Sequence, residues 1–104
     1  MTRVSFAQRG GMFTAFTLSG HSMAAESGSD IVCAAVSSAV YMAANTITEI
    51  LGADADITVE DGYFHLALTG ADAERCAPMM RGLRLHLSEL ARQYPDHITM
   101  NTEE

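Results

Sequence analysis

Two side chains in this sequence can combine into a nucleophilic centre. Cys33 lies three residues after Asp30, where a helix is predicted to begin. The unpaired N–H groups and the dipole at a helix N-terminus favour an anion, so they stabilise a thiolate in the first turn. His21 lies twelve residues upstream, where a strand gives way to a loop. If that loop folds back, His21 and Cys33 meet as an activated cysteine nucleophile.

Both residues also have simpler interpretations. Cysteine is among the residues most often buried, and Cys33 lies in an apolar segment, so it can be an ordinary core residue. Taken alone, His21 is a loop histidine of a common kind. Its catalytic interpretation depends on the pairing with Cys33.

Two neighbouring residues can support such a centre. Ser37 is predicted one helical turn beyond Cys33, where its hydroxyl can donate to the thiolate or bond back to a helix carbonyl. Asp30 can orient His21 or cap the helix, and the sequence favours capping. The second cysteine, Cys76, falls on the apolar stripe of a later helix and is predicted to be a core residue.

The first half of the chain predicts a hairpin, a loop and a buried helix. Apolar residues on both sides of a turn at 8–11 predict a β-hairpin that ends at residue 18. Residues 19–29 are small and without a clean period, which is typical of a functional loop. Residues 30–51 are apolar on nearly every face, which predicts a buried helix with Ser29 or Asp30 as its N-cap.

The second half follows a similar order. An Asp61-Gly62 turn between residues 57–60 and 63–68 predicts a second hairpin. An apolar stripe predicts a helix over residues 72–94 with Pro78 near its beginning, and residues 97–100 form a short last strand. The order β-β-α-β-β-α-β predicts a single α+β domain over residues 1–104, a two-layer sandwich in which two helices pack on one mixed β-sheet.

Composition narrows the partners and the location. The 104 residues include six arginines, no lysine and 13 acidic residues, for a net charge of -7. Such a chain has no basic tract for direct contact with nucleic acid, and its acidic field favours a basic partner. The apolar stretch 31–44 is shorter than the about 20 residues of a membrane span, and the N-terminus lacks a secretory pattern, so we expect a cytoplasmic protein with no membrane partner. Neither a metal nor another cofactor is indicated by any motif.

One longer pattern resembles a known family. Gly20-His21-Ser22 together with residues 28–37, Gly-Ser-Asp-Ile-Val-Cys-Ala-Ala-Val-Ser, resembles the signature of the ribosomal-processing cysteine protease family, often called Prp. The resemblance implies a small homodimeric α+β protein that removes a short N-terminal extension from a large-subunit ribosomal protein. It also implies that Cys33 is the nucleophile and His21 the general base. Ser22 departs from the pattern, because the family more usually has alanine there.

The same resemblance implies that Gly20, Asp30 and Ser37 support the site. Our leading hypothesis is therefore a cysteine endopeptidase that needs no cofactor, with a ribosomal protein precursor as its peptide substrate. Residues 22–29 are predicted to form a lid that orders on the substrate. The alternative is a non-catalytic dimeric module that binds a ribosomal protein during ribosome assembly, with Cys33 merely packed in the core.

Overall fold

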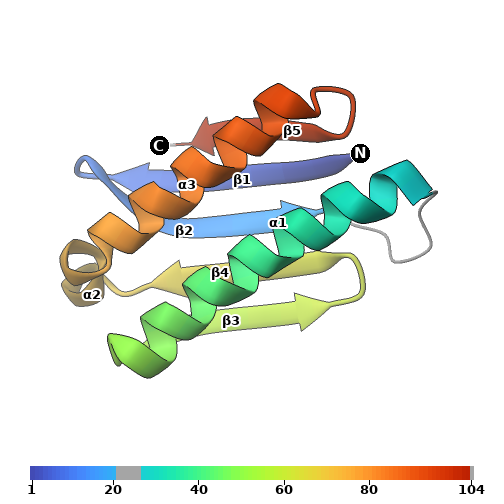
Figure 1. Ribbon diagram of the computed structural model, residues 1–104. Coiled ribbons are helices and arrows are strands. Elements are labelled where there is room, and N and C mark those ends of the chain that lie inside the picture. Colours follow the sequence, from blue (N-terminus) through green and yellow to red (C-terminus); the bar gives the residue numbers. More distant parts are fainter. Residues whose placement is uncertain (21–26, 104) are drawn as a thin grey trace.

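Two layers make up the fold, as the computed structural model shows for residues 1–20 and 27–103 (Figure 1). One layer is a five-stranded sheet in the order β3-β4-β2-β1-β5, and the long helices α1 and α3 cover one of its faces. The strands are β1 (Thr2–Arg9), β2 (Met12–Ser19), β3 (Ala55–Glu60), β4 (Tyr63–Leu68) and β5 (Ile98–Glu103). The helices are α1 (Ser27–Asn45), the π-helix η1 (Thr46–Ile50), α2 (Gly70–Arg75) and α3 (Ala77–Gln93).

The sheet is mixed, as predicted. Strand β5 pairs with β1 in parallel, whereas the β1–β2, β2–β4 and β3–β4 pairs are antiparallel. Both predicted hairpins are present. Gly10 and Gly11 have φ angles of 61° and 80° between β1 and β2, a left-handed conformation that glycine adopts at little steric cost. The predicted α+β sandwich is therefore confirmed.

The core lies between the sheet and the two long helices. Alternate strand residues point toward the helices, and the Phe16 and Phe64 rings stack there with their centroids 5.8 Å apart. From the helical layer come apolar residues at helical spacing. The fully buried side chains include Phe6, Phe16, Leu66, Val36, Val40, Met80, Leu83 and Leu87.

Helix α1 starts earlier than the sequence predicts. It begins at Ser27, so Asp30 lies in its first turn and Cys33 in its second. The prediction of Ser29 or Asp30 as the N-cap was therefore wrong. Once the apolar segment nucleates a helix, each added residue forms one more hydrogen bond, and no proline stops growth toward Ser27.

The predicted helix over residues 72–94 is divided into α2 and α3. The break falls at Cys76, whose φ and ψ of -90° and 1° leave the α-helical region. Pro78 lies in the first turn of α3, where its missing N–H is harmless. Inside one continuous helix its ring would clash with the carbonyl of Glu74, four residues earlier, which accounts for the break.

Residues 31–50 form a helical segment with a mean hydropathy of 1.5, long and apolar enough to cross a membrane by length and composition. Of this segment, 44% is buried inside the fold. The core helix of a folded domain has the same composition because it packs on a sheet.

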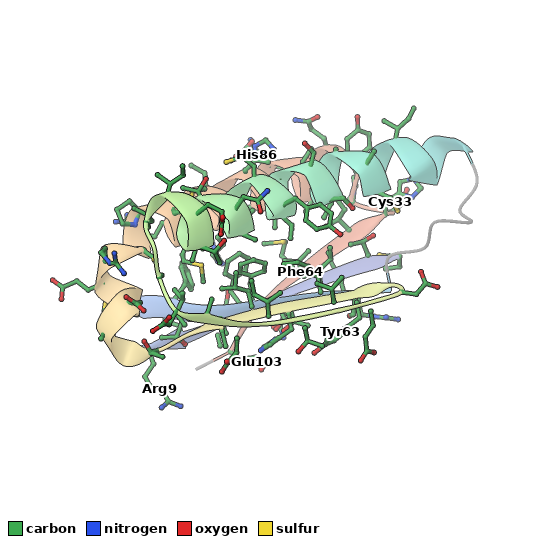
Figure 2. All side chains as sticks on the ribbon, turned by 90° about the horizontal axis from the view of Figure 1, so that it is seen from below. Arg9, Cys33, Tyr63, Phe64, His86 and Glu103 are labelled. Carbon is green, nitrogen blue, oxygen red and sulfur yellow. The ribbon has the colours of Figure 1, made fainter. Side chains whose placement is uncertain are left out.

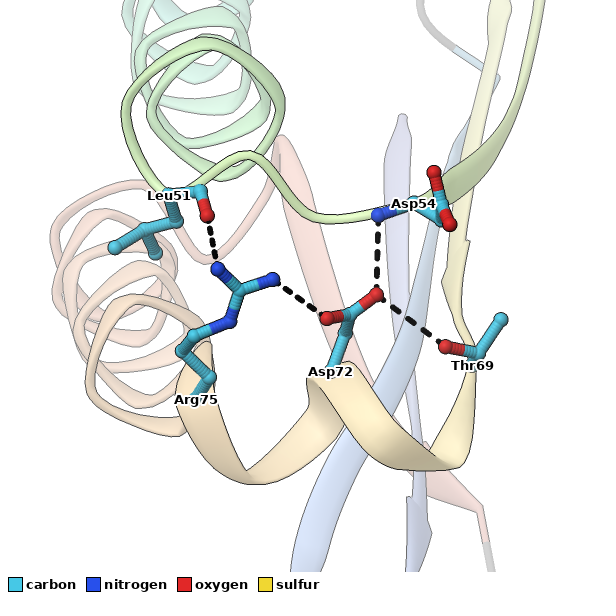
Figure 3. A network of polar contacts seen from close by, with 5 residues as sticks. All are labelled: Leu51, Asp54, Thr69, Asp72 and Arg75. Carbon is cyan, nitrogen blue, oxygen red and sulfur yellow. Dashed lines mark hydrogen bonds and ion pairs between the residues drawn. The ribbon is translucent and has the colours of Figure 1, made fainter.

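A polar network joins α2 to the connection that follows η1 (Figure 3). The Asp72 carboxylate accepts hydrogen bonds from the backbone N–H of Asp54 at 3.0 Å and from the Thr69 hydroxyl at 3.3 Å. Its other oxygen is 2.6 Å from the Arg75 guanidinium, which also donates to the carbonyl of Leu51. The network thus ties α2 to the segments on either side of the β3–β4 hairpin.

Candidate active site

Cys33 lies at the edge of the core. Its side chain is on the sheet-facing side of α1, near the N-terminal end of that helix (Figure 2). The residue is 9% exposed, its neighbour Val32 is buried, and the thiol is free. The residues that the structure describes therefore cover most of this side chain.

Its second-turn position changes the expected electrostatics. Within α1 the N–H groups of residues 27–29 have no helical partner, because each would need a carbonyl from before the helix. The stabilising effect of a helix N-terminus falls off within the first turn. Cys33 lies one turn beyond these N–H groups, and their action on its thiolate or on an oxyanion beside it stays a prediction.

Gly20 terminates β2 in a conformation that requires glycine. Its φ is +75°, and a Cβ built there would lie 2.5 Å from the carbonyl oxygen of Met1. A side chain would therefore displace the N-terminal end of the sheet. The close approach sets the direction in which the chain leaves β2, immediately before His21, and it gives a physical reason for a glycine at this position.

The structure describes only some of the other predicted site residues. His21 lies outside the described residues, so its pairing with Cys33 stays a prediction. Of the predicted lid over residues 22–29, the part at 22–26 also lies outside the described residues. Ser27 to Ser29 belong to α1. Asp30 lies in the first turn of α1 but is not its N-cap, and its orientation of His21 also stays a prediction.

A cavity of about 270 Å³ lies beside this site, between α1 and the β3–β4 hairpin. Leu18 at the end of β2 and Ser37 on α1 both line it. Ser37 is four residues beyond Cys33, about 6 Å further along the helix axis. The cavity therefore connects the strand that leads to His21 with the helix that carries Cys33.

Part of this cavity was not predicted from the sequence. Glu60 and Asp61, at the β3–β4 turn, and Tyr41, on α1, also line it. The Asp-Gly turn signal located the hairpin, but only the strand order places that hairpin opposite α1. Within residues 1–20 and 27–103, no group of three His, Cys, Asp or Glu residues is placed to hold a metal ion.

Cys76 has a different environment, as the sequence predicts. It is 0% exposed and forms part of the core at the α2–α3 junction. Burial raises the pKa of its thiol, because the thiolate is poorly solvated there. Cys76 is therefore a structural residue and not a nucleophile.

A mixed sheet with a thiol at the edge of its core, beside a cavity, defines a small α+β protein suited to cysteine chemistry. Residues 1–99 match the family described as "Cysteine protease Prp". The chain therefore belongs to this family and is a cysteine-type endopeptidase. This result favours the predicted protease over the alternative of a non-catalytic module.

Individual relatives agree with this assignment. The chain is 29% identical over 93 residues to the ribosomal processing cysteine protease Prp of Bacillus subtilis, covering 84% of this chain and 83% of the relative. The Prp of Staphylococcus aureus (strain Mu50) is 26% identical over 93 residues, with 88% of each chain covered.

Solved structures show the same fold. The crystal structure of SMU.848 from Streptococcus mutans superposes with a TM-score of 0.90 at 27% identity, covering 99% of this chain and 94% of the other. The essential ribosomal processing protease Prp from S. aureus, in complex with a substrate peptide, also has a TM-score of 0.90, at 24% identity. That match covers 99% of this chain and 100% of the other.

Proposed function

We propose that this chain removes the N-terminal extension of a large-subunit ribosomal protein precursor, with Cys33 as nucleophile and His21 as general base. The observation that carries this proposal is the position of Cys33. It is the cysteine at the edge of the core, next to a cavity that is partly lined by the strand leading to His21. The names of the relatives in B. subtilis and S. aureus supply the substrate class.

The path of the chain supports the pairing of the two residues. Leu18 precedes His21 by three residues and Ser37 follows Cys33 by four, and both line one cavity. Gly20 fixes the exit from β2 through its close approach to Met1. His21 follows Gly20 directly in the sequence, and one residue of extended chain spans about 3.3 Å.

The reaction proposed for these two residues is acyl transfer in two steps. His21 takes the proton of the Cys33 thiol, and the thiolate attacks the scissile carbonyl carbon. His21 then gives that proton to the leaving amine, and a thioester bond replaces the amide bond. In the second step His21 removes a proton from water, the hydroxide attacks the thioester, and the Cys33 thiol is restored with release of a carboxylic acid.

Charge supports a basic substrate. The net charge of -7 attracts positively charged proteins during diffusional encounter, and the effect weakens with salt. Ribosomal proteins are basic partners of this kind, as expected for proteins that contact RNA phosphates.

Two further features belong to the proposal. We propose that the chain also forms a homodimer. The outer face of α1 exposes apolar side chains such as Ile31 and Met42, which are 67% and 56% exposed, and a second copy can cover them. We also include a cytoplasmic location, since both cysteines are free thiols and the cytosol keeps thiols reduced.

The test is cleavage of the ribosomal protein precursor from the same genome, with the products weighed by mass spectrometry. The wild type is expected to release one N-terminal fragment. Cys33→Ala should fold normally and cut at least about a thousandfold more slowly, because it lacks the nucleophile. Cys76→Ala is the matched control and should keep its activity per folded molecule. Unchanged cleavage by Cys33→Ala would overturn the proposal.

A further inference from the structure

The cavity between α1 and the β3–β4 hairpin has an apolar floor and an acidic rim. Val40, Phe64 and Leu18 form buried parts of its wall. Tyr41 stands at its edge, half exposed, with its ring edge-on to Phe64 at 5.8 Å between centroids. At about 270 Å³ the cavity is near the lower limit for ligand sites, which suits one side chain better than a free metabolite.

The rim carries two carboxylates that have no cationic partner among the residues that the structure describes. Glu60 and Asp61 are exposed and both line the cavity. Within residues 1–20 and 27–103, neither takes part in an ion pair or a side-chain hydrogen bond, and no arginine lines the cavity. Two adjacent negative charges beside an apolar hollow favour a ligand that combines an apolar group with a cation.

The distance to Cys33 identifies the part of a substrate that reaches the cavity. Its α1 wall runs from Ser37 to Tyr41, which is about 6 to 12 Å from Cys33 along the helix axis. An extended peptide advances about 3.3 Å per residue. A side chain in this cavity therefore belongs to a residue about two to four positions from the bond at Cys33.

We propose that this cavity is a specificity subsite for a substrate segment in which an apolar residue is adjacent to a basic one, Lys or Arg. The apolar side chain fills the cavity against Tyr41, and Glu60 and Asp61 attract the cationic neighbour. The inference rests on the proposed function, since it takes the reaction to occur at Cys33. It adds residues that select the substrate without acting on the scissile bond.

The charge part is tested by a peptide scan. Peptides that cover the N-terminal segment of the precursor are made with each position changed in turn to Lys, Gln and Glu, and kcat/KM is measured with the wild type. At one position two to four residues from the cut bond, we expect kcat/KM for the Lys peptide to be about tenfold higher than for the Glu peptide. Two exposed carboxylates attract the lysine together. The ratio should fall toward one at high salt.

Variants assign that preference to the rim. Glu60→Gln and Asp61→Asn should each reduce the Lys-over-Glu ratio by about twofold to fivefold. Asp56→Asn is the matched control, because Asp56 is an exposed carboxylate on the same strand outside the cavity. An unchanged ratio in both rim variants, or a ratio of one in the wild type, would overturn the inference while leaving the protease proposal intact.

The apolar part is tested by a double-mutant cycle. Tyr41→Ala should raise KM by about tenfold, and it should reduce the penalty of replacing the adjacent apolar peptide residue by alanine. Leu85→Ala is the control, since Leu85 is 64% exposed on α3 and does not line the cavity. Additive effects of the two changes would overturn this part.

A binding experiment tests the subsite independently of cleavage. If the wild type does not cut the precursor, the proposed function fails. The same peptides are then measured for binding to Cys33→Ala by fluorescence anisotropy. A preference for Lys that is lost in Glu60→Gln and Asp61→Asn supports the subsite, and equal affinities overturn it. A dimer that dissociates when Tyr41 is changed to Ala would also overturn it, because a second copy would then occupy the cavity.

Discussion

The start of α1 and the α2–α3 junction lie toward opposite ends of the helical layer (Figure 1). The first carries Cys33 and the second carries Cys76, and the surroundings of the two thiols differ. Cys33, near the start of α1, is 9% exposed and one helical turn from a cavity. Cys76, between α2 and α3, is 0% exposed and follows directly on Arg75, which is held by the Asp72 network. Packing and hydrogen bonds thus close one end of the fold, whereas the other end carries a thiol and the exposed carboxylates of Glu60 and Asp61. A cysteine at one end is therefore available for chemistry, and a cysteine at the other end stabilises the core.

Chemical labelling provides the sharpest test of this comparison. With iodoacetamide on the folded protein, Cys33 should react faster than Cys76 by about two orders of magnitude, because Cys76 is reached only after the core opens. Mass mapping of the labelled peptides as a function of time measures both rates. Cys76→Ala should leave the Cys33 rate unchanged. Equal rates for the two thiols in the folded state would remove the distinction between the two ends.

Gly20 tests how strictly the open end is positioned. Gly20→Ala should lower kcat/KM by about tenfold to a hundredfold, because its Cβ meets the Met1 carbonyl and redirects the chain before His21. Gly10→Ala is the matched control, since Gly10 also has a positive φ, of +61°, but has no atom within 4 Å of a built Cβ. Both variants should lose stability from the strain of a positive φ, and Gly20→Ala should lose more because of the contact with Met1. Equal cleavage by both would show that the close approach at Gly20 does not position the site.

Cys76 tests the closed end. Cys76→Ala should lower the free energy of unfolding by about 1–2 kcal/mol, because it removes a fully buried sulfur and leaves a small void. Cys33→Ala should lower the free energy of unfolding by less, since Cys33 is 9% exposed and lies outside the core cluster. Urea unfolding of both variants measures the difference through the midpoint at constant slope. A larger loss in Cys33→Ala would mean that Cys33 carries the packing role.

Local chemistry explains what could be predicted from the sequence. The glycines at 10, 11 and 62 specify their hairpins because the required backbone angles depend only on the turn itself. The apolar spacing of α3 identified its buried face for the same reason. The start of α1 was less determined, because several residues from Ser27 to Asp30 are acceptable caps. The apolar spacing also predicted one continuous helix and so missed the break at Cys76, although Pro78 is a signal for a break.

The cavity depends on contacts that no local pattern specifies. Glu60 and Tyr41 line it together because β3 and β4 lie at one edge of the sheet and α1 crosses above them. Strand order is a property of the whole fold. The spacing of residues in the sequence therefore could not predict that the acidic rim lies on the same side of the fold as Cys33. Asp72 is similar, since its partners Asp54 and Thr69 come from both sides of a hairpin.

The smallest expected effect concerns pH at the closed end. The hydrogen bond from Arg75, followed by that from the Asp54 N–H, holds the pKa of Asp72 below its usual value of 3.8. Because the folded-state pKa is lowered, the ionised carboxylate stabilises the fold above pH 3.8, and this stability is lost as the pH falls through the folded-state value. The Asp72 side chain is 16% exposed and that of its partner Arg75 is 49% exposed, so solvent screens the pair and the effect is modest.

Urea midpoints of the wild type and Asp72→Asn, measured between about pH 5 and pH 2.5, report this contribution. The wild type should be more stable at the upper end of this range, and its advantage should shrink toward the lower end as Asp72 becomes protonated. Asp56→Asn is the matched control for removal of one carboxylate charge, since Asp56 is exposed and forms no ion pair within the described part of the chain. A wild-type advantage that stays constant with pH would show that the network closes this end by geometry alone, without help from the charge of Asp72.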